Sequence, residues 1–82
     1  MREYLQALRE YEKLCKEKIE YFKARYNSGI ENRKIYKDDP DMLKEYPENQ
    51  IESFKICEEI FIQELEAVRK KINSLENEMT TE

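Results

Sequence analysis

Few residues of this 82-residue chain are of types that carry out chemistry, and none of them is a histidine. The chain therefore lacks the side chain that most often acts as a general base near neutral pH. It holds a single glycine, so it has no glycine-rich phosphate loop, and it has no nucleophile-elbow motif. These features predict a protein that is not an enzyme and that binds no cofactor.

Two cysteines and one acidic run are the remaining candidates for chemistry. Cys15 and Cys57 cannot form a zinc site without two further good ligands. Both lie on or beside apolar stripes, which favours buried structural thiols over reactive ones. The acidic run at residues 38–41 lacks the spacing and the glycine of a calcium loop, and helix capping explains it better. We therefore predict no metal site.

Composition and charge narrow the class of protein. Charged residues make up 41% of the chain and hydrophobic residues 39%, with two prolines, which is typical of a helix-rich soluble protein. The acidic net charge of −4 argues against wholesale coating of nucleic acid or an anionic membrane. No signal peptide is visible, and no apolar run approaches the ~20 residues that span a bilayer. We expect a cytoplasmic protein without a membrane partner.

The spacing of apolar residues predicts an all-α fold with two long amphipathic helices. The first is expected over about residues 2–26, because basic residues followed by Asn27, Ser28 and Gly29 indicate its end. The second is expected over about residues 48–79, starting beside Pro47. Apolar residues alternate along it by three and four, with one polar exception, Glu58. This seam comprises Ile51, Phe54, Glu58, Phe61, Leu65, Val68, Ile72, Leu75 and Met79.

Residues 27–47 are expected to form an irregular connector between the long helices. Asp39 reads as an N-cap and Pro40 as a first helical position, so a short helix should follow over about residues 41–45. Residues 80–82 are expected to be a frayed tail. Residues 1–82 then form a single domain, an antiparallel helical hairpin.

The hairpin places two polar residues opposite each other. With facing residues at index sums near the mid-seventies, Phe22 falls near Phe54 and Lys18 falls near Glu58. Lys18 and Glu58 could fix the register as a buried polar pair. Alternatively, each side chain extends from the edge of the seam into water.

Each long helix also carries a second apolar strip. Ile56, Ile60 and Ala67 lie on the back of the last helix, and Leu14, Tyr21 and Ala7 form a similar strip on the first. A hairpin has only one internal interface, so it cannot cover both strips. Three occupants remain open: the middle segment folded back on Ile56 and Ile60, a second copy that completes a four-helix bundle, or a foreign protein.

The remaining candidate binding residues are tyrosines and basic side chains. Tyr36 and Tyr46, in the connector, are of a type common at interfaces, although packing on their own helices also explains them. A basic stripe runs along one face of the first helix and consists of Arg2, Arg9, Lys13, Lys16 and Lys23. It could contact a nucleic-acid backbone, but a solvated face of spaced lysines explains it more simply.

Two functions follow as hypotheses. The first is a non-enzymatic protein-protein interaction module, an adaptor, regulator or inhibitor of a larger protein that acts through helix-face recognition, with a second copy of itself as a further partner. The alternative is a small dimeric helical bundle that binds RNA or DNA through the basic stripe.

Overall fold

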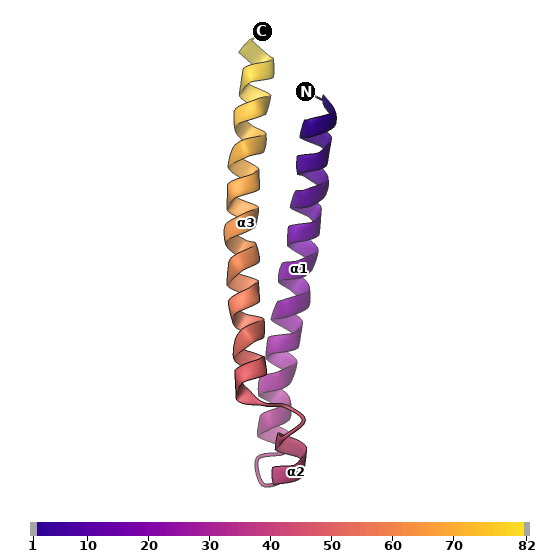
Figure 1. Cartoon of the computed structure of the whole chain (residues 1–82), viewed down its shortest axis with the longest axis vertical. Helices are drawn as coiled ribbons and strands as arrows, with labels where there is room; N and C mark the ends of the chain where they lie inside the picture. Colours follow the sequence, from indigo (N-terminus) through magenta and orange to yellow (C-terminus); the bar gives the residue numbers. More distant parts are fainter. Residues whose placement is uncertain (1, 82) are drawn as a thin grey trace.

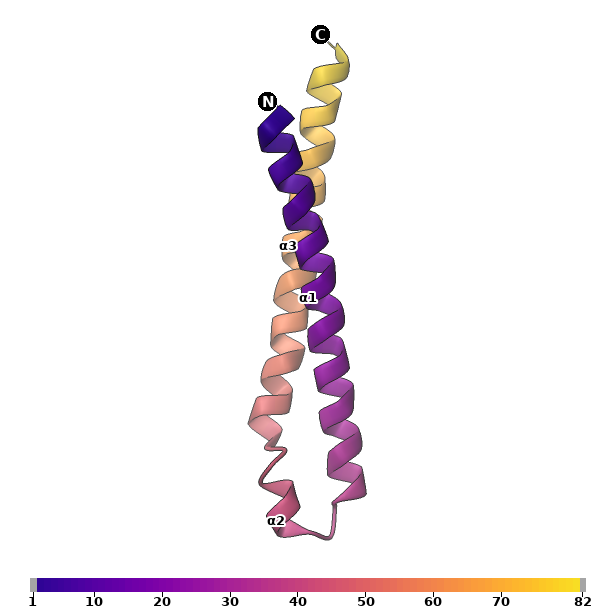
Figure 2. The same ribbon diagram turned by 90° about the vertical axis from the view of Figure 1, so that its right-hand side faces the viewer.

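The computed structural model describes residues 2–81, which form an antiparallel pair of long helices joined by a short one (Figure 1). Helix α1 spans Arg2–Ile35, α2 spans Pro40–Leu43 and α3 spans Glu48–Thr81. The chain measures 65 × 16 × 14 Å, with both termini at one end and α2 at the other (Figure 1). The turned view shows α1 and α3 crossing each other along this length (Figure 2). The prediction of an all-α helical hairpin is confirmed.

A single apolar seam between α1 and α3 holds the hairpin together. Its buried apolar residues are Leu5, Cys15, Ile51, Val68, Ile72 and Leu75. Near the middle, the ring of Phe22 lies 6.3 Å from that of Phe54 and 6.0 Å from that of Phe61. The register predicted from the sequence placed Phe22 beside Phe54, as observed. Because the apolar residues recur at alternating steps of three and four, they lie along one face of each helix, and the seam is therefore continuous.

Helix α1 does not end near Tyr26, so the predicted boundary was wrong. It continues through Asn27, Ser28 and Gly29 to Ile35. Gly29 is buried in the helix, and a Cβ built on it would lie 2.6 Å from the Cγ1 of Ile51. The lack of a side chain at Gly29 therefore lets α3 pack close to α1, and Gly29 does not cap the end of α1. Packing against α3 outweighs the roughly 1 kcal/mol by which glycine disfavours a helix interior.

The connector is correspondingly shorter than expected. Asp39 caps α2 as predicted, because its carboxylate accepts a hydrogen bond from the Met42 backbone N–H at 3.2 Å. Pro40 is the first residue of α2, as predicted, and α2 ends two residues before the predicted end. Arg33 ties the connector to α3: its guanidinium donates to the Tyr46 carbonyl at 2.7 Å and lies 3.2 Å from the Glu48 carboxylate.

Helix α3 begins where the sequence indicated, directly after Pro47. It reaches Thr81, so residues 80 and 81 continue the helix where a frayed tail was expected. Glu82, the last residue of that predicted tail, lies outside the described residues. Inside a long helix the backbone N–H and C=O groups hydrogen-bond to one another, so the side chains determine what each face of the helix can contact.

Candidate interaction surface

Four large apolar side chains outside the seam are about half exposed. Ile56 and Ile60 on α3 are 51% and 50% exposed, and Leu14 and Tyr21 on α1 are 43% and 52% exposed. All four belong to the second strips found in the sequence. The structure leaves both strips in contact with solvent.

The two strips lie on the same side of the hairpin. Tyr11 donates a hydrogen bond to Glu64 at 3.0 Å, and this bond joins the two helices along one flank of the seam. At ~100° per residue, Leu14 and Tyr21 lie on the Tyr11 flank of α1. By the same rule, Ile60 lies on the Glu64 flank of α3, whereas Ile56 lies on the back of α3, roughly opposite the seam.

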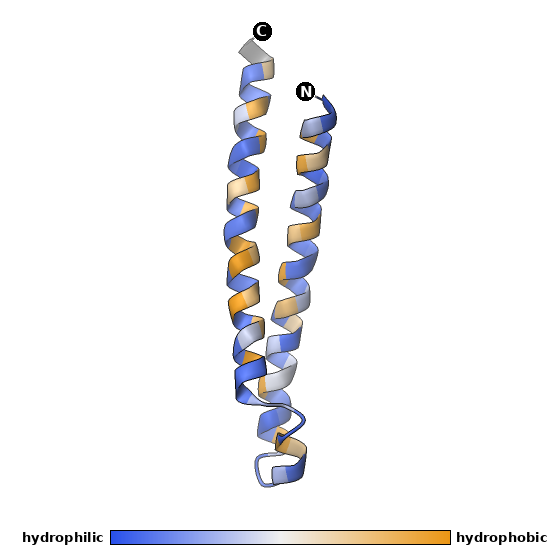
Figure 3. Ribbon diagram, in the orientation of Figure 1, coloured by the Kyte–Doolittle hydropathy of each residue, from blue (hydrophilic) through white to orange (hydrophobic). Residues whose placement is uncertain are grey.

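The strips also meet at matching levels along the long axis. Tyr11 lies opposite Glu64, and Phe22 lies opposite Phe54 and Phe61. Because Gly29 lies against Ile51 and Arg69 binds Glu12, facing residues have index sums near 80, so Tyr21 lies level with Ile60 and Leu14 lies level with Ala67. We call this surface the apolar side and define it by Leu14, Tyr21 and Ile60. Coloured by hydropathy, the two long helices carry apolar stretches at these middle levels (Figure 3).

No part of the chain that the structure describes covers the apolar side. Helix α2 and the connector lie at the closed end of the hairpin, beyond the level of Ile56 and Ile60 (Figures 1 and 2). The middle segment therefore does not fold back on these isoleucines, and that expected occupant is excluded. The reason is the longer α1, which carries residues 27–35 away from the strip as part of a straight helix.

The other predicted interface residues fall into two groups. Ala67 is exposed on the same flank of α3 and extends the apolar side toward the termini. Tyr36 and Tyr46 are only half-exposed and stack on each other at the closed end, with ring centroids 6.0 Å apart. These tyrosines therefore pack within the chain, and the structure does not bring them to the strips.

The polar register pair is not formed. No ion pair joins Lys18 to Glu58 within residues 2–81. Lys18 is exposed and lies 6.0 Å from the ring of Tyr21, whereas Glu58 is 8% exposed at the seam. Neither residue has a buried polar atom without a hydrogen-bond partner. The alternative, in which the head group reaches water from the seam edge, fits Lys18, whereas Glu58 is enclosed at the seam.

The opposite flank of the hairpin is charged. Arg69 binds Glu12 at 2.9 Å, and Arg9 pairs with Glu76. The basic stripe lies on this flank, and all five of its residues are exposed. Because Glu76 already engages Arg9, the stripe offers fewer unpaired cations than its sequence suggests. We call this flank the ion-pair side.

Residues with possible reactivity are few and mostly enclosed. Cys15 is fully buried and Cys57 is half-buried, and neither forms a disulfide. The hydrogen bond from Tyr11 to the Glu64 carboxylate, together with partial desolvation, raises the pKa of the Tyr11 phenol to about 12. Tyr11 therefore remains protonated at neutral pH and acts as a donor that links the helices.

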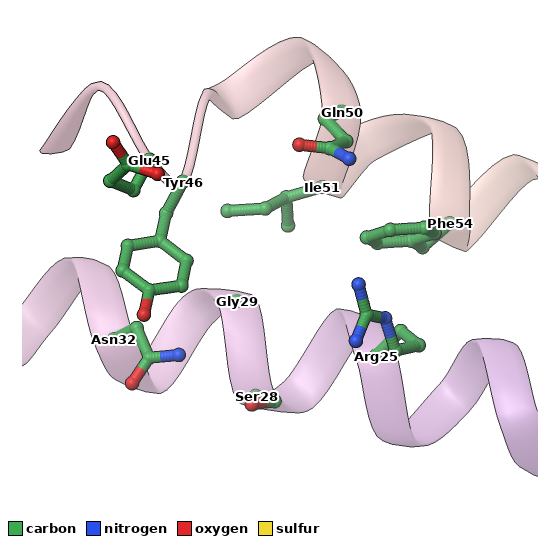
Figure 4. Close-up of a pocket in the computed structure, with 9 residues that line it drawn as sticks. All are labelled: Arg25, Ser28, Gly29, Asn32, Glu45, Tyr46, Gln50, Ile51 and Phe54. Carbon is green, nitrogen blue, oxygen red and sulfur yellow. The ribbon is translucent and has the colours of Figure 1, made fainter.

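A shallow pocket lies at the closed end, where the connector meets both long helices (Figure 4). The ring of Tyr46 reaches from the connector toward α1, and Ile51 lies over Gly29 (Figure 4). The Arg25 guanidinium lies 5.4 Å from the Phe54 ring centroid, on the α3 side of the pocket. These contacts pack the loop end, and the pocket brings no acid-base pair together.

Sequence reasoning missed several exposed apolar residues. Ile35, at the end of α1, is 61% exposed. Ile62 is 37% exposed on the ion-pair side, because at ~100° per residue it lies about 160° around α3 from Ile60. Tyr4, Tyr11 and Met79 are also exposed, although Met79 was predicted as part of the seam of the second long helix. Their positions at the open end or at the seam edge explain this, since no third layer covers either place.

Within residues 2–81, no group of three or more cysteine, aspartate or glutamate side chains is placed to hold a metal ion. None of the described helices is long and apolar enough to cross a membrane. No protein-family model, curated protein or solved structure matches this chain.

Proposed function

We propose that this chain is a non-enzymatic protein-protein interaction module whose recognition surface is the apolar side. It acts as an adaptor, regulator or inhibitor of a larger protein by presenting Leu14, Tyr21 and Ile60 to it. The observation that carries the proposal is the half-exposure of these three side chains, two from α1 and one from α3, on one side of the hairpin. Exposed apolar patches of several side chains mark interaction sites in soluble proteins.

The geometry favours a helical partner. The apolar side spans two antiparallel helices, and the apolar face of an amphipathic helix can pack across such a surface. Tyr21 is suited to the role of anchor, because its ring packs edge-on against Phe22 at 5.1 Å. A ring already held in place loses less side-chain entropy when a partner binds.

Photo-crosslinking in the source cells tests this proposal. A photoreactive phenylalanine derivative replaces Ile60 in one variant and Ile62 in another. The two positions are the same residue type on the same helix, but Ile62 lies on the ion-pair side. We expect a covalent adduct with a larger protein from the Ile60 position only. Equal adducts from both positions, or none from Ile60, would contradict the proposal.

The nucleic-acid hypothesis has less support. The basic stripe is exposed, but Arg9 pairs with Glu76 and the net charge is −4. If this hypothesis held, charge reversal at Lys13 and Lys16 would abolish binding to a duplex DNA or RNA probe, and binding would weaken steeply with salt. Binding that ignores both changes would remove it.

A further inference from the structure

The pocket at the closed end is bordered by polar side chains that the chain itself does not use. Its volume is about 290 Å³, at the lower end of the ~300–1,000 Å³ range of pockets that bind small molecules. Arg25, Asn32 and Gln50 line it, and within residues 2–81 none of their side chains forms a hydrogen bond or an ion pair. Three polar groups from two helices therefore meet at one small cavity with their hydrogen-bonding capacity free for a ligand.

Apolar side chains complete the lining of the pocket. Ile51 and Phe54 of α3 lie along one side of it, and the ring of Tyr46 lies at its connector end (Figure 4). Ile51 is buried, whereas Phe54 and Tyr46 are half-exposed and leave part of each ring open to the cavity. An apolar lining with a few convergent polar groups is the composition of a small-molecule site.

Arg25 determines the charge of the ligand. Its guanidinium lies over the ring of Phe54, 5.4 Å from the centroid. This contact uses the face of the guanidinium and leaves its edge N–H groups free, and two such groups can bind one carboxylate in parallel. Among the residues that the structure describes, Arg25 is the only cation that lines the pocket, so the site favours a single negative charge.

Glu45 disfavours a more highly charged anion. It lines the pocket at the connector end, whereas Arg25 lies at the Phe54 end (Figure 4). A phosphate ester carries about −1.5 to −2 at neutral pH, which one arginine does not balance and which Glu45 repels. A carboxylate carries one negative charge and matches the single guanidinium.

We infer that this cavity, which we call the closed-end pocket, binds a small organic carboxylate. Arg25 binds the carboxylate group, and the amides of Asn32 and Gln50 hydrogen-bond to the polar edge of the ligand. The apolar body of the ligand lies against Phe54 and Tyr46. The inference goes beyond the proposed function and is independent of it, because the closed-end pocket shares no residue with the apolar side.

Titration of the full chain with benzoate, followed by proton–nitrogen correlation NMR, tests the inference. The backbone amide of Gly29 reports on the pocket, and its signal is easy to assign because the chain has one glycine. We expect a saturable shift of this signal with a dissociation constant on the order of 1 mM. Benzamide, the neutral analogue, should bind at least about tenfold more weakly because it lacks the charge that pairs with Arg25. Phenyl phosphate should bind no more tightly than benzoate.

Two matched pairs of variants locate the site. Arg25→Gln should weaken benzoate binding at least about tenfold, whereas Lys18→Gln, which removes a positive charge one heptad earlier on the same flank of α1, should change it less than about twofold. Asn32→Ala should weaken binding about fivefold, whereas Asn27→Ala, the same change outside the pocket, should leave it unchanged. Far-ultraviolet circular dichroism checks that each variant keeps its helices.

The outcomes against the inference are specific. No saturable shift at Gly29, equal binding of benzoate and benzamide, or equal effects of Arg25→Gln and Lys18→Gln would overturn the site. Tighter binding of phenyl phosphate than of benzoate would overturn the assignment to a carboxylate. The crosslinking experiment at Ile60 probes another surface, so its failure would count against the proposed function and not against the closed-end pocket.

Discussion

Gly29 is the residue at which the structure departs most from what the sequence suggested, and its replacement by alanine is the sharpest test of the fold. Gly29 lies within α1, opposite Ile51 of α3. The added methyl carbon would lie 2.6 Å from the Cγ1 and 3.0 Å from the Cδ1 of Ile51. Carbon atoms in contact normally lie about 3.5–4.0 Å apart, so one helix or the Ile51 side chain has to move by about 1 Å.

Two opposing effects set the size of the change. Alanine improves the helix interior by about 1 kcal/mol relative to glycine. Overpacking a filled site costs about 1–3 kcal/mol, and Ile51, at 4% exposure, has little room to yield. We therefore expect Gly29→Ala to lower the free energy of unfolding by about 1 kcal/mol, although helix propensity alone would raise it.

A double-mutant cycle with Ile51→Ala isolates the contact. Urea unfolding followed by far-ultraviolet circular dichroism gives each free energy of unfolding at one fixed protein concentration. Ile51→Ala alone should cost about 2–5 kcal/mol through the cavity it creates. In that background the clash is gone, so Gly29→Ala should now stabilise by about 1 kcal/mol, a coupling of roughly 2 kcal/mol.

The neighbouring Ser28 supplies the matched control. It lies in the same turn of α1 but is exposed, so Ser28→Ala should raise stability by about 0.5 kcal/mol through helix propensity. If Gly29→Ala stabilises the wild-type background as Ser28→Ala does, the close approach of the two helices at Gly29 is wrong. The continuation of α1 against α3 would then need another explanation.

Three further predictions concern the seam and the connector. The pKa of Tyr11 in the folded protein is raised above its unfolded value of about 10, so the stability that Tyr11 contributes is complete below pH 10 and is lost as the pH rises toward 12. Tyrosinate absorbance should show this late titration. The Glu64→Gln variant should move the pKa of Tyr11 back toward 10. Glu58→Leu should raise the free energy of unfolding by about 1–2 kcal/mol, because it buries an apolar group at a seam position. The control Glu59→Leu, at an exposed position, should change the free energy of unfolding by less than about 0.5 kcal/mol. An equal effect of both variants would refute the assignment of Glu58 to the seam. Arg33→Lys keeps the charge but loses the simultaneous contacts of the guanidinium with the Tyr46 carbonyl and the Glu48 carboxylate, so limited proteolysis should cut the connector faster. An unchanged rate of cleavage would show that these contacts do not hold the connector in place.

The elements that the sequence predicted well are those determined by local chemistry. The three-four alternation from Ile51 to Leu75 indicated α3 and its buried face, and Asp39 followed by Pro40 indicated the start of α2. Each signal depends on residues within one or two turns. The end of α1 was missed because Gly29 has the same local meaning as a cap or as a contact point, and only the position of Ile51 decides between them.

The candidate site was predictable in part. Helical spacing identified Ile56 and Ile60 on one helix and Leu14 and Tyr21 on the other as apolar strips outside the seam. Spacing within one helix does not say on which flank of the hairpin a strip lies, because that depends on how the two helices are rotated against each other. The Tyr11–Glu64 hydrogen bond supplies that rotation, and with it the coincidence of the two strips.

The contrast between the two flanks explains why one side of this hairpin is suited to a further layer. One flank is joined by the Arg69–Glu12 and Arg9–Glu76 pairs, whereas the other carries Leu14 and Tyr21 of α1 at the levels of Ala67 and Ile60 of α3. Scattered surface apolar residues need no explanation. Alignment by flank and by level on two separate helices is what a shared contact surface requires, because both helices must meet the same partner at the same place. Ile60, and not the equally apolar Ile62, is therefore the position at which a change should be felt outside the hairpin itself.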